Sequence, residues 1–401
     1  MEPVLHITGA GVVSAIGCGQ EETLDALRRG VTGIGPVQYL ETVEKAFPVG
    51  EVKHSNAELA ALTGASPDLS RTSLLGIMAL QEALRQAGLA DLTGVPLIGG
   101  TTVGGMDLTE KTFPSYSRLH DCGASTDAIA AHFGGALWAT TLSTACSSAA
   151  NAVIFGANLI RSGQADIVAV GGSECLSDFH LHGFGSLMIL DTAPCRPFDA
   201  TRAGLNLGEG AAFLILESEA SRKRRGVPSL AVLSGFGNAC DAFHQTASSP
   251  DGEGAYRAMA QALARAGLQP GDIDYVNAHG TGTPNNDASE SAALKRVFGE
   301  ALPPISSTKA FTGHTTSASG SIEAVFCLLV LQHGFIPPQL NWTTPDPACI
   351  VPYRGTESSC PAPTLPSCPA PTGHLPLRHI LCNAFGFGGN DSSLLFSRPD
   401  A

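Results

Sequence analysis

Basic residues are scarce in this sequence, and it holds no long hydrophobic run. The 401 residues include 23 Lys and Arg against 36 Asp and Glu, which gives a formal net charge of -13. Because nucleic acids and membrane surfaces are anionic, this balance argues against binding of either by the molecule as a whole. No apolar stretch reaches the roughly 20 residues that a membrane-spanning helix needs. We therefore expect no nucleic-acid partner and no membrane span.

The N-terminal segment and the cysteines bear on the cellular compartment. Residues 1–8 lack both the basic region and the apolar core of a secretory signal. The 11 cysteines are an odd number and include no C-x-x-C pair. This usage is typical of a reducing compartment rather than of a disulfide framework, so we expect a cytoplasmic protein.

Strand and helix patterns alternate along nearly the whole chain, which predicts an α/β architecture. The predicted strands are 4–8, 96–101, 167–171, 211–216, 229–236, 273–278, 305–307, 379–383 and 392–397. The predicted helices are 21–29, 72–87, 147–161, 255–266, 288–298 and 321–332. A chain of this length is usually too long to fold around a single hydrophobic core. The predicted elements after residue 228 also follow the same order as those before it. We therefore expect two similar halves, 1–228 and 229–401.

Two segments interrupt this pattern. Four consecutive basic residues lie within 221–228, and we favour a solvated helix end over a docking patch, because cations stabilise a helix C-terminus. Prolines are concentrated in residues 345–376. Since proline is excluded from helices and central strands, we predict an extended surface loop there, with a Pro-rich binding motif as the alternative.

The first chemical signal is Cys146, in the run Thr-Ala-Cys-Ser-Ser at 144–148, where the predicted helix 147–161 begins. A thiol at a helix N-terminus faces unpaired N–H groups and the positive end of the helix dipole. Both should lower its pKa and favour the reactive thiolate. We therefore expect a nucleophile, with an inert buried core residue as the alternative.

Further reactive side chains follow other predicted strands. His279 lies in Asn-Ala-His-Gly-Thr-Gly-Thr-Pro, whereas Lys309 and His314 lie in Ser-Ser-Thr-Lys-Ala-Phe-Thr-Gly-His. A Gly-rich turn, Asn-Ala-Phe-Gly-Phe-Gly-Gly-Asn, spans 383–390. Because ligands bind in α/β sheets at the carboxyl ends of strands, we expect these groups to share one site of covalent catalysis.

Together these motifs resemble the β-ketoacyl-acyl carrier protein synthases, elongating type II enzymes of the thiolase-like fold. The resemblance covers nearly the whole chain and includes Arg-Pro-Phe-Asp at 196–199 and Gly-Glu-Gly-Ala-Ala at 208–212. It implies two βαβαβαββ halves in an αβαβα five-layer arrangement. It also implies decarboxylative Claisen condensation of a Cys-bound acyl chain with malonyl-acyl carrier protein, in fatty-acid or polyene/polyketide biosynthesis. Two motifs, Gly-Leu-Asn-Leu-Gly-Glu-Gly at 204–210 and Thr-Val-Gly-Gly-Met-Asp at 102–107, resemble synthases of aryl-polyene or flexirubin pigment pathways more than housekeeping fatty-acid enzymes.

The resemblance also implies a role for each matching residue. Cys146 would carry the acyl chain, and His279 and His314 would bind the malonyl thioester oxygen and promote decarboxylation, because N–H donors stabilise the enolate that forms. Lys309 and Glu323 would order the His-bearing loop. The remaining roles are an oxyanion hole from the N–H groups of Cys146 and Phe387, a gate at Phe387 beside Phe385, pantetheine contacts at Thr281 and Thr283, and an acyl pocket lined by Val103 and Phe184.

The implied substrates are carried on the phosphopantetheine of acyl carrier protein, with no cofactor of the enzyme's own. The implied assembly is a homodimer formed across an edge strand, with a heterodimer as the alternative. Three stretches depart from the family pattern: Gly-Gly-Asn-Asp at 388–391, Leu-Asn at 205–206, and the polar run at 315–319. Basic residues that could dock the carrier are sparse near Arg71, which leaves Arg118 and Arg202 as candidates.

Two other functions stay open. The chain could be a chain-length-determining or obligate heterodimer partner of a ketosynthase, although such subunits typically lack the nucleophile that this chain keeps. It could also bind a metal through four histidines: His180, His182, His279 and His314. Their spacing is not diagnostic of a metal site, so we expect no metal.

Overall fold

Eleven strands form one mixed sheet in the computed structural model, which describes residues 4–355 and 375–401. The strand order is β4-β3-β5-β6-β1-β7-β11-β10-β8-β9, with β2 paired to β1. In chain order the strands are β1 (Leu5–Ser14), β2 (Gly17–Cys18), β3 (Leu97–Gly100), β4 (Ala139–Leu142), β5 (Ile167–Glu174), β6 (Gly210–Ser218), β7 (Ala231–Cys240), β8 (Tyr275–Asn277), β9 (Ile305–Ser306), β10 (His379–Gly386) and β11 (Asn390–Ser397). The α-helices are α1 (Gln20–Arg29), α2 (Asn56–Thr63), α3 (Arg71–Ala87), α4 (Met106–Thr112), α5 (Cys122–His132), α6 (Ser148–Arg161), α7 (Asp178–Ser186), α8 (Glu219–Arg225), α9 (Glu253–Ala266), α10 (Pro284–Phe298), α11 (Lys309–Thr312) and α12 (Ser319–His333).

The two halves of the chain have the same arrangement of strands. The first half has the order β4-β3-β5-β6-β1, and the second has β9-β8-β10-β11-β7. In each half the first three strands are parallel and the other pairings are antiparallel. The predicted duplication is therefore confirmed in strand order and direction. The halves are joined where β1 pairs with β7 through His6–Val232 and Ile7–Ala231.

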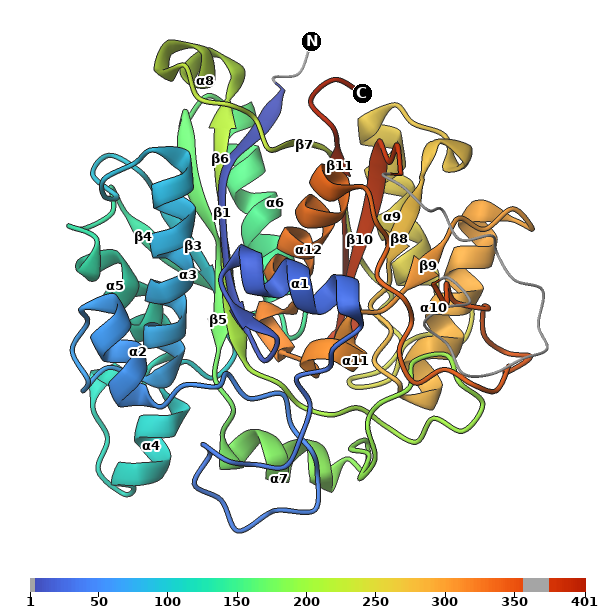
Figure 1. The fold of residues 1–401 in the computed structure, drawn as a ribbon, viewed down its shortest axis with the longest axis horizontal. Coiled ribbons are helices and arrows are strands. Elements are labelled where there is room, and N and C mark those ends of the chain that lie inside the picture. The colour runs from blue at the N-terminus through green and yellow to red at the C-terminus, as the bar shows by residue number, and fades with distance from the viewer. Residues whose placement is uncertain (1–3, 356–374) are drawn as a thin grey trace.

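Alternating side chains divide the core into layers, which run from left to right in Figure 1. Ala212, Leu214 and Leu216 of β6 belong to a central core with α6 and α12, whereas Ala211, Phe213 and Ile215 belong to an outer core with α3 and α5. Helices α9 and α10 cover the outer face of the second half. This is the expected five-layer arrangement, and it buries α6 and α12 between the two halves of the sheet.

Every predicted strand and helix is found, with ends shifted by a few residues. Sequence patterning misses β2, β4, α2, α4, α5, α7 and α11. The sequence of β4, Ala-Thr-Thr-Leu, is short and partly polar, because the strand lies at the sheet edge and is only half-buried. The side chains of α5 show no strong apolar period, which removes the usual sign of a helix.

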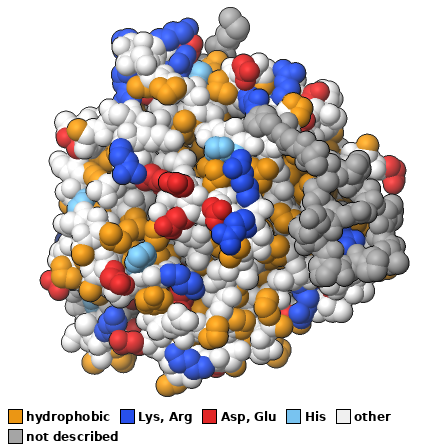
Figure 2. All heavy atoms as spheres, in the orientation of Figure 1, with side chains coloured by type: hydrophobic (Ala, Val, Ile, Leu, Met, Phe, Trp, Pro, Cys, Tyr) orange, Lys and Arg blue, Asp and Glu red, His pale blue; other side chains and the backbone are white. Residues whose placement is uncertain are grey.

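The basic segment forms the end of α8, and Figure 2 shows its Lys and Arg side chains gathered at the top of the molecule. Each of them pairs with a carboxylate: Arg222 and Lys223 with Glu219, Arg224 with Asp166, and Arg225 with Glu217. The helix-end interpretation is therefore confirmed. On the rest of the face shown in Figure 2, basic and acidic groups are interspersed.

The predicted proline-rich surface loop, 345–376, lies mostly outside the described residues, because these do not include 356–374. Within 345–355 the prediction is partly wrong. Cys349 and Ile350 are buried in the outer core of the second half, and the Ile350 N–H donates to Ser291 Oγ on α10. None of the helices in the described ranges is long and apolar enough to cross a membrane.

Candidate active site

Cys146 lies in a tight turn between β4 and α6. Ala145, the residue before it, has a φ of 53°, a conformation that residues with a side chain rarely adopt. Ser148 Oγ accepts the Thr144 N–H and donates to the Ala145 carbonyl, and Ser147 Oγ donates to the Thr144 carbonyl. These bonds hold the strained turn and direct Cys146 to a cavity of about 330 Å³.

Burial controls the acidity of this thiol. Cys146 is only 5% exposed, and desolvation raises its pKa to about 11. Lys309 and the N–H groups of Phe387 and Cys146 act in the opposite direction but do not offset it. The expected lowering of the pKa by the helix N-terminus is therefore wrong. The resting thiol is protonated at neutral pH.

The cavity brings together most of the predicted site residues from both halves of the chain. Its wall includes Cys146, Phe184, His279, Thr281, Thr283, His314, Phe385 and Phe387. The wall also includes the apolar side chains of Leu187, Ile189 and Leu205, and polar groups from Thr246, Ser248, Asn285 and Asn286. Val103, Lys309 and Glu323 do not line it.

His279 lies two residues after the end of β8, and a neighbouring side chain fixes the position of its ring proton. Its Nδ1 lies 3.3 Å from Lys309 Nζ. An ammonium group can only donate, so Nδ1 accepts and the ring carries its proton on Nε2. Burial, aided by the charge of Lys309, lowers the pKa of His279 well below its ordinary value. The ring is therefore neutral, with an N–H on Nε2.

Lys309 is held by Glu323, the one acidic residue of α12. Lys309 Nζ donates to Glu323 Oε1 over 2.6 Å, and both side chains are almost fully buried. Burial raises the pKa of Glu323 to about 7, while Lys309 opposes this rise. Because this pair lies behind His279 rather than in the cavity wall, it acts through the histidine.

His314 lies beside His279, with ring centroids 5.3 Å apart and an interplanar angle of 84°. Its backbone N–H donates to the Asn206 carbonyl over 2.7 Å, so the Leu-Asn stretch at 205–206 holds the segment that carries His314. Its Nδ1 lies 3.0 Å from Ser319 Oγ. Burial and Lys309 lower the pKa of His314 well below its ordinary value, so this ring is also neutral.

Glu290 of α10 is a site residue that sequence reasoning missed. Its carboxylate accepts the N–H groups of His279 and Gly280, and Asn383 Nδ2 donates to it as well. These bonds fix the turn after β8. The available signal is an acidic residue on the buried face of the predicted helix 288–298, where an apolar residue would be expected.

The Gly-rich turn between β10 and β11 places Phe387 over the cavity. The Phe387 ring stacks on Phe184, with centroids 5.9 Å apart. Gly389 has a φ of 74°, and a Cβ built there would lie 2.0 Å from Asp241 Oδ1, so only glycine fits. Asn390 Oδ1 lies 3.0 Å from Ser147 Oγ, and this contact joins the Gly-rich turn to the turn that holds Cys146.

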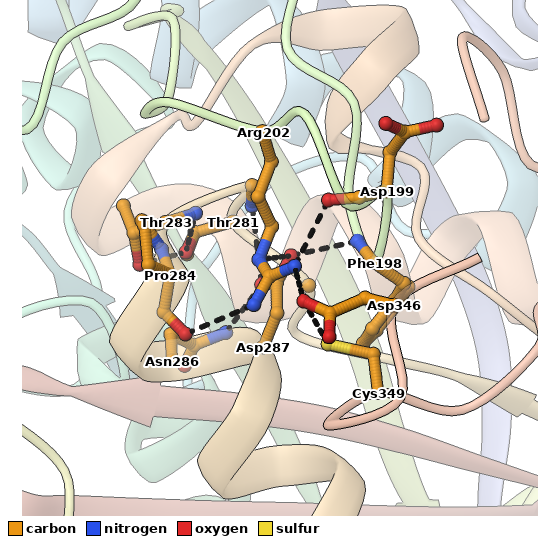
Figure 3. Close-up of polar contacts among 12 residues, drawn as sticks. Phe198, Asp199, Arg202, Thr281, Thr283, Pro284, Asn286, Asp287, Asp346 and Cys349 are labelled. Atoms are coloured by element: carbon orange, nitrogen blue, oxygen red, sulfur yellow. Dashed lines mark hydrogen bonds and ion pairs between the residues drawn. The ribbon is translucent and has the colours of Figure 1, made fainter. Parts of the chain in front are cut away.

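Thr281 and Thr283 lie beside a buried charge cluster (Figure 3), and their hydroxyl oxygens are 2.9 Å apart. Arg202 donates to Asp346 over 2.5 Å, and its Nε lies 3.6 Å from Asp287 Oδ2. Its side chain is only 5% exposed, so a surface docking role for Arg202 is wrong. Arg202 also donates to the Pro284 carbonyl, which anchors the start of α10 beside the cavity.

The histidine-rich segment gives no support to a metal site. His180 and His182 lie on α7, not on a strand, and His180 Nδ1 lies 3.1 Å from Ser177 Oγ. Within the described parts of the chain, no group of three or more His, Cys, Asp or Glu side chains could hold a metal ion.

Comparisons with known proteins agree with this geometry. Residues 1–222 match the family described as Beta-ketoacyl synthase, N-terminal domain, and residues 230–343 match the C-terminal domain. The chain is 32% identical to 3-oxoacyl-[acyl-carrier-protein] synthase 2 of Staphylococcus aureus (strain COL), over 98% of each chain. It is 35% identical to Nodulation protein E of Rhizobium meliloti (strain 1021), over 99% of this chain and 100% of the relative. The solved structure of the ishigamide ketosynthase/chain length factor aligns with a TM-score of 0.87 at 30% identity, over 99% of this chain and 100% of that one. The chain therefore belongs to the β-ketoacyl synthase family.

Proposed function

We propose that the cavity around Cys146 joins a Cys-bound acyl chain to malonyl-acyl carrier protein by decarboxylative Claisen condensation, giving β-ketoacyl-acyl carrier protein. The observation that carries this assignment is the convergence of one thiol and two neutral imidazoles, His279 and His314, on one cavity. Neutral imidazoles are N–H donors that can stabilise an enolate oxygen without acting as strong acids.

In the first half-reaction the Cys146 sulfur attacks the acyl thioester carbonyl carbon of the carrier. The N–H groups of Cys146 and Phe387, which both act on the sulfur in the resting site, receive the oxyanion. The new bond is sulfur to acyl carbon, and the bond that breaks is acyl carbon to pantetheine sulfur. The proton of the Cys146 thiol ends on the departing pantetheine thiol.

In the second half-reaction the two histidines donate to the thioester oxygen of the malonyl group. Loss of CO2 leaves the electron pair of the broken C–C bond as an enolate, whose carbon attacks the acyl carbon on Cys146. A C–C bond forms, the Cys146 sulfur leaves as a thiolate, and it takes up a proton from solvent. Lys309 keeps the Nε2 proton of His279 in place, and Glu323 holds Lys309.

The substrates of this reaction would arrive on the phosphopantetheine of acyl carrier protein, and the enzyme would need no cofactor of its own. Thr281 and Thr283 lie in the cavity wall and offer hydroxyls to the pantetheine amides. Phe184 and the apolar lining residues Leu187, Ile189 and Leu205 would hold the acyl chain. The placement of the boundary between halves near residue 228 and the assignment to a pigment pathway stay predictions.

Two copies of the chain are proposed to pair along β4, the edge strand of the first half. A heterodimer with a paralogous synthase or chain-length factor is the second candidate, because one solved relative is a ketosynthase/chain length factor assembly. In such a pair the retained Cys146, His279 and His314 would make this chain the catalytic subunit.

Intact-mass spectrometry after incubation with a panel of acyl-acyl carrier proteins tests the assignment. We expect one acyl group on the peptide that holds Cys146, and none in Cys146→Ala. Cys240→Ala is the matched control, because Cys240 is an exposed thiol outside the cavity wall, and it should acylate normally. Acylation that persists in Cys146→Ala would refute the mechanism. A chain that condenses substrates only when mixed with a paralogue would establish the heterodimer.

A further inference from the structure

A chain of two hydroxyl groups ends on the ring of His314. Ser319 Oγ lies 3.0 Å from His314 Nδ1, and Thr315 Oγ1 lies 3.1 Å from Ser319 Oγ. All three residues are at most 2% exposed, so bulk water does not compete for these groups. Both hydroxyls belong to the polar run 315–319.

The direction of this chain follows from the need to satisfy buried donors. If Thr315 donates to Ser319 and Ser319 donates to His314 Nδ1, each O–H finds an acceptor and the ring proton lies on Nε2. In the reverse direction the Thr315 O–H would be a buried donor without an acceptor, since Thr315 Oγ1 has no second partner among the described residues. Buried polar groups are nearly always paired, and an unpaired one is costly. The first direction is therefore favoured.

We propose that Ser319 is a positioning residue for the condensation: its hydroxyl donates to Nδ1 of His314 and so presents the Nε2–H of that ring to the malonyl thioester oxygen. The proposal rests on the role given to His314 above. Both histidines would then carry their ring proton on Nε2, because a donor contacts Nδ1 in each case. The donor is the ammonium group of Lys309 for His279 and the hydroxyl of Ser319 for His314.

Without the Ser319 hydroxyl, the His314 proton is no longer confined to Nε2. The tautomer with its proton on Nδ1 presents a lone pair to the cavity, and a lone pair repels the oxygen of a developing enolate. Formation of the Cys146 thioester does not use this donor in the mechanism given above. Loss of the hydroxyl should therefore slow decarboxylation and spare acylation.

The first turn of α12 offers a matched pair of substitutions. Ser319→Ala removes one oxygen from a buried site and adds nothing. Ser321→Ala does the same two residues later, where Oγ donates to the Ala318 carbonyl over 3.2 Å and not to a histidine. Ser319→Thr keeps the hydroxyl. Ser319→Cys keeps the size of serine with a weak donor, and it carries the test if the alanine variant does not fold.

The experiment measures the two half-reactions separately in the full-length chain: CO2 release from malonyl-acyl carrier protein, and acylation of Cys146. For Ser319→Ala we expect the kcat of CO2 release to fall about tenfold, the effect of one lost hydrogen bond, with acylation changed less than about twofold. Ser319→Cys should behave in the same direction, and Ser319→Thr should restore CO2 release. Ser321→Ala should leave both rates near those of the wild type.

The outcomes separate this proposal from the function on which it rests. If Ser319→Ala matches Ser321→Ala, or slows acylation as much as decarboxylation, the positioning role is overturned. If the wild type releases no CO2, or His314→Ala releases it as fast as the wild type, the proposed function itself fails.

Discussion

Asp391 is a buried acidic residue, and its substitution should change how the stability of the protein depends on pH. The residue lies at the start of β11, directly after the gate turn, and is only 4% exposed. Burial, together with the charges of Asp241 and Glu290, raises the pKa of Asp391 to about 8 from an ordinary value of 3.8. The Gly386 N–H opposes this rise without reversing it.

The sign of the effect follows from proton binding. Between about pH 4 and pH 8 the folded protein keeps a proton on Asp391 that the unfolded chain releases, so this group makes folding progressively less favourable as pH rises. Each tenfold change in proton affinity corresponds to about 1.4 kcal/mol. At pH 7 the cost is therefore up to about 4 kcal/mol. The substitution Asp391→Asn would keep a hydrogen-bonding side chain of the same shape without this cost.

The pH-dependent cost of burying Asp391 can be measured from the unfolding midpoints of the wild type and Asp391→Asn across pH 5 to 8. We expect the variant to be more stable, by a margin that widens as pH rises. Asp68→Asn is the control, because Asp68 is exposed and its substitution should give a small difference that does not vary with pH. A constant margin for Asp391→Asn, or a wild type that is the more stable at pH 8, would refute the reasoning.

Three further predictions concern the reacting groups. Gly389→Ala should lower the steady-state rate of condensation much more than Gly388→Ala. Both glycines have positive φ, but only a Cβ at Gly389 would lie against the carboxylate of Asp241. Equal losses of rate in the two variants would contradict a steric cause. Lys309→Met should slow CO2 release at least about tenfold by removing the donor to His279 Nδ1, while acylation measured by mass spectrometry continues; unchanged CO2 release would contradict this role. Alkylation of Cys146 by iodoacetamide should accelerate about tenfold per pH unit between pH 7 and 9, because its pKa is about 11; a plateau near neutrality would show a thiolate already present.

The grouping of reactive side chains at the ends of strands could be predicted from the sequence, whereas the pKa of Cys146 and the contacts that support the histidines could not. His279 and Lys309 follow adjacent parallel strands, so their meeting follows from the strand order alone. The acidity of Cys146 depends on how deeply the second half of the chain buries it, and no local pattern records that depth. Glu290 and Ser319 act through contacts made only in the folded protein. The edge strand β4 lacks an apolar run because it is half-buried.

Because the sheet is duplicated, the proposed reaction depends on the relative position of the two halves. Cys146 follows β4, and the segment with Lys309 and His314 follows β9, which is the counterpart of β4 in the second half. In the proposed mechanism the two copies thus contribute different groups at the same junction. One copy carries the acyl chain on Cys146, and the other bears the histidines that stabilise the enolate. Neither copy holds a complete set of reacting groups. Any change that slides the copies against each other, even one far from the cavity, would alter the distance over which the new carbon–carbon bond must form.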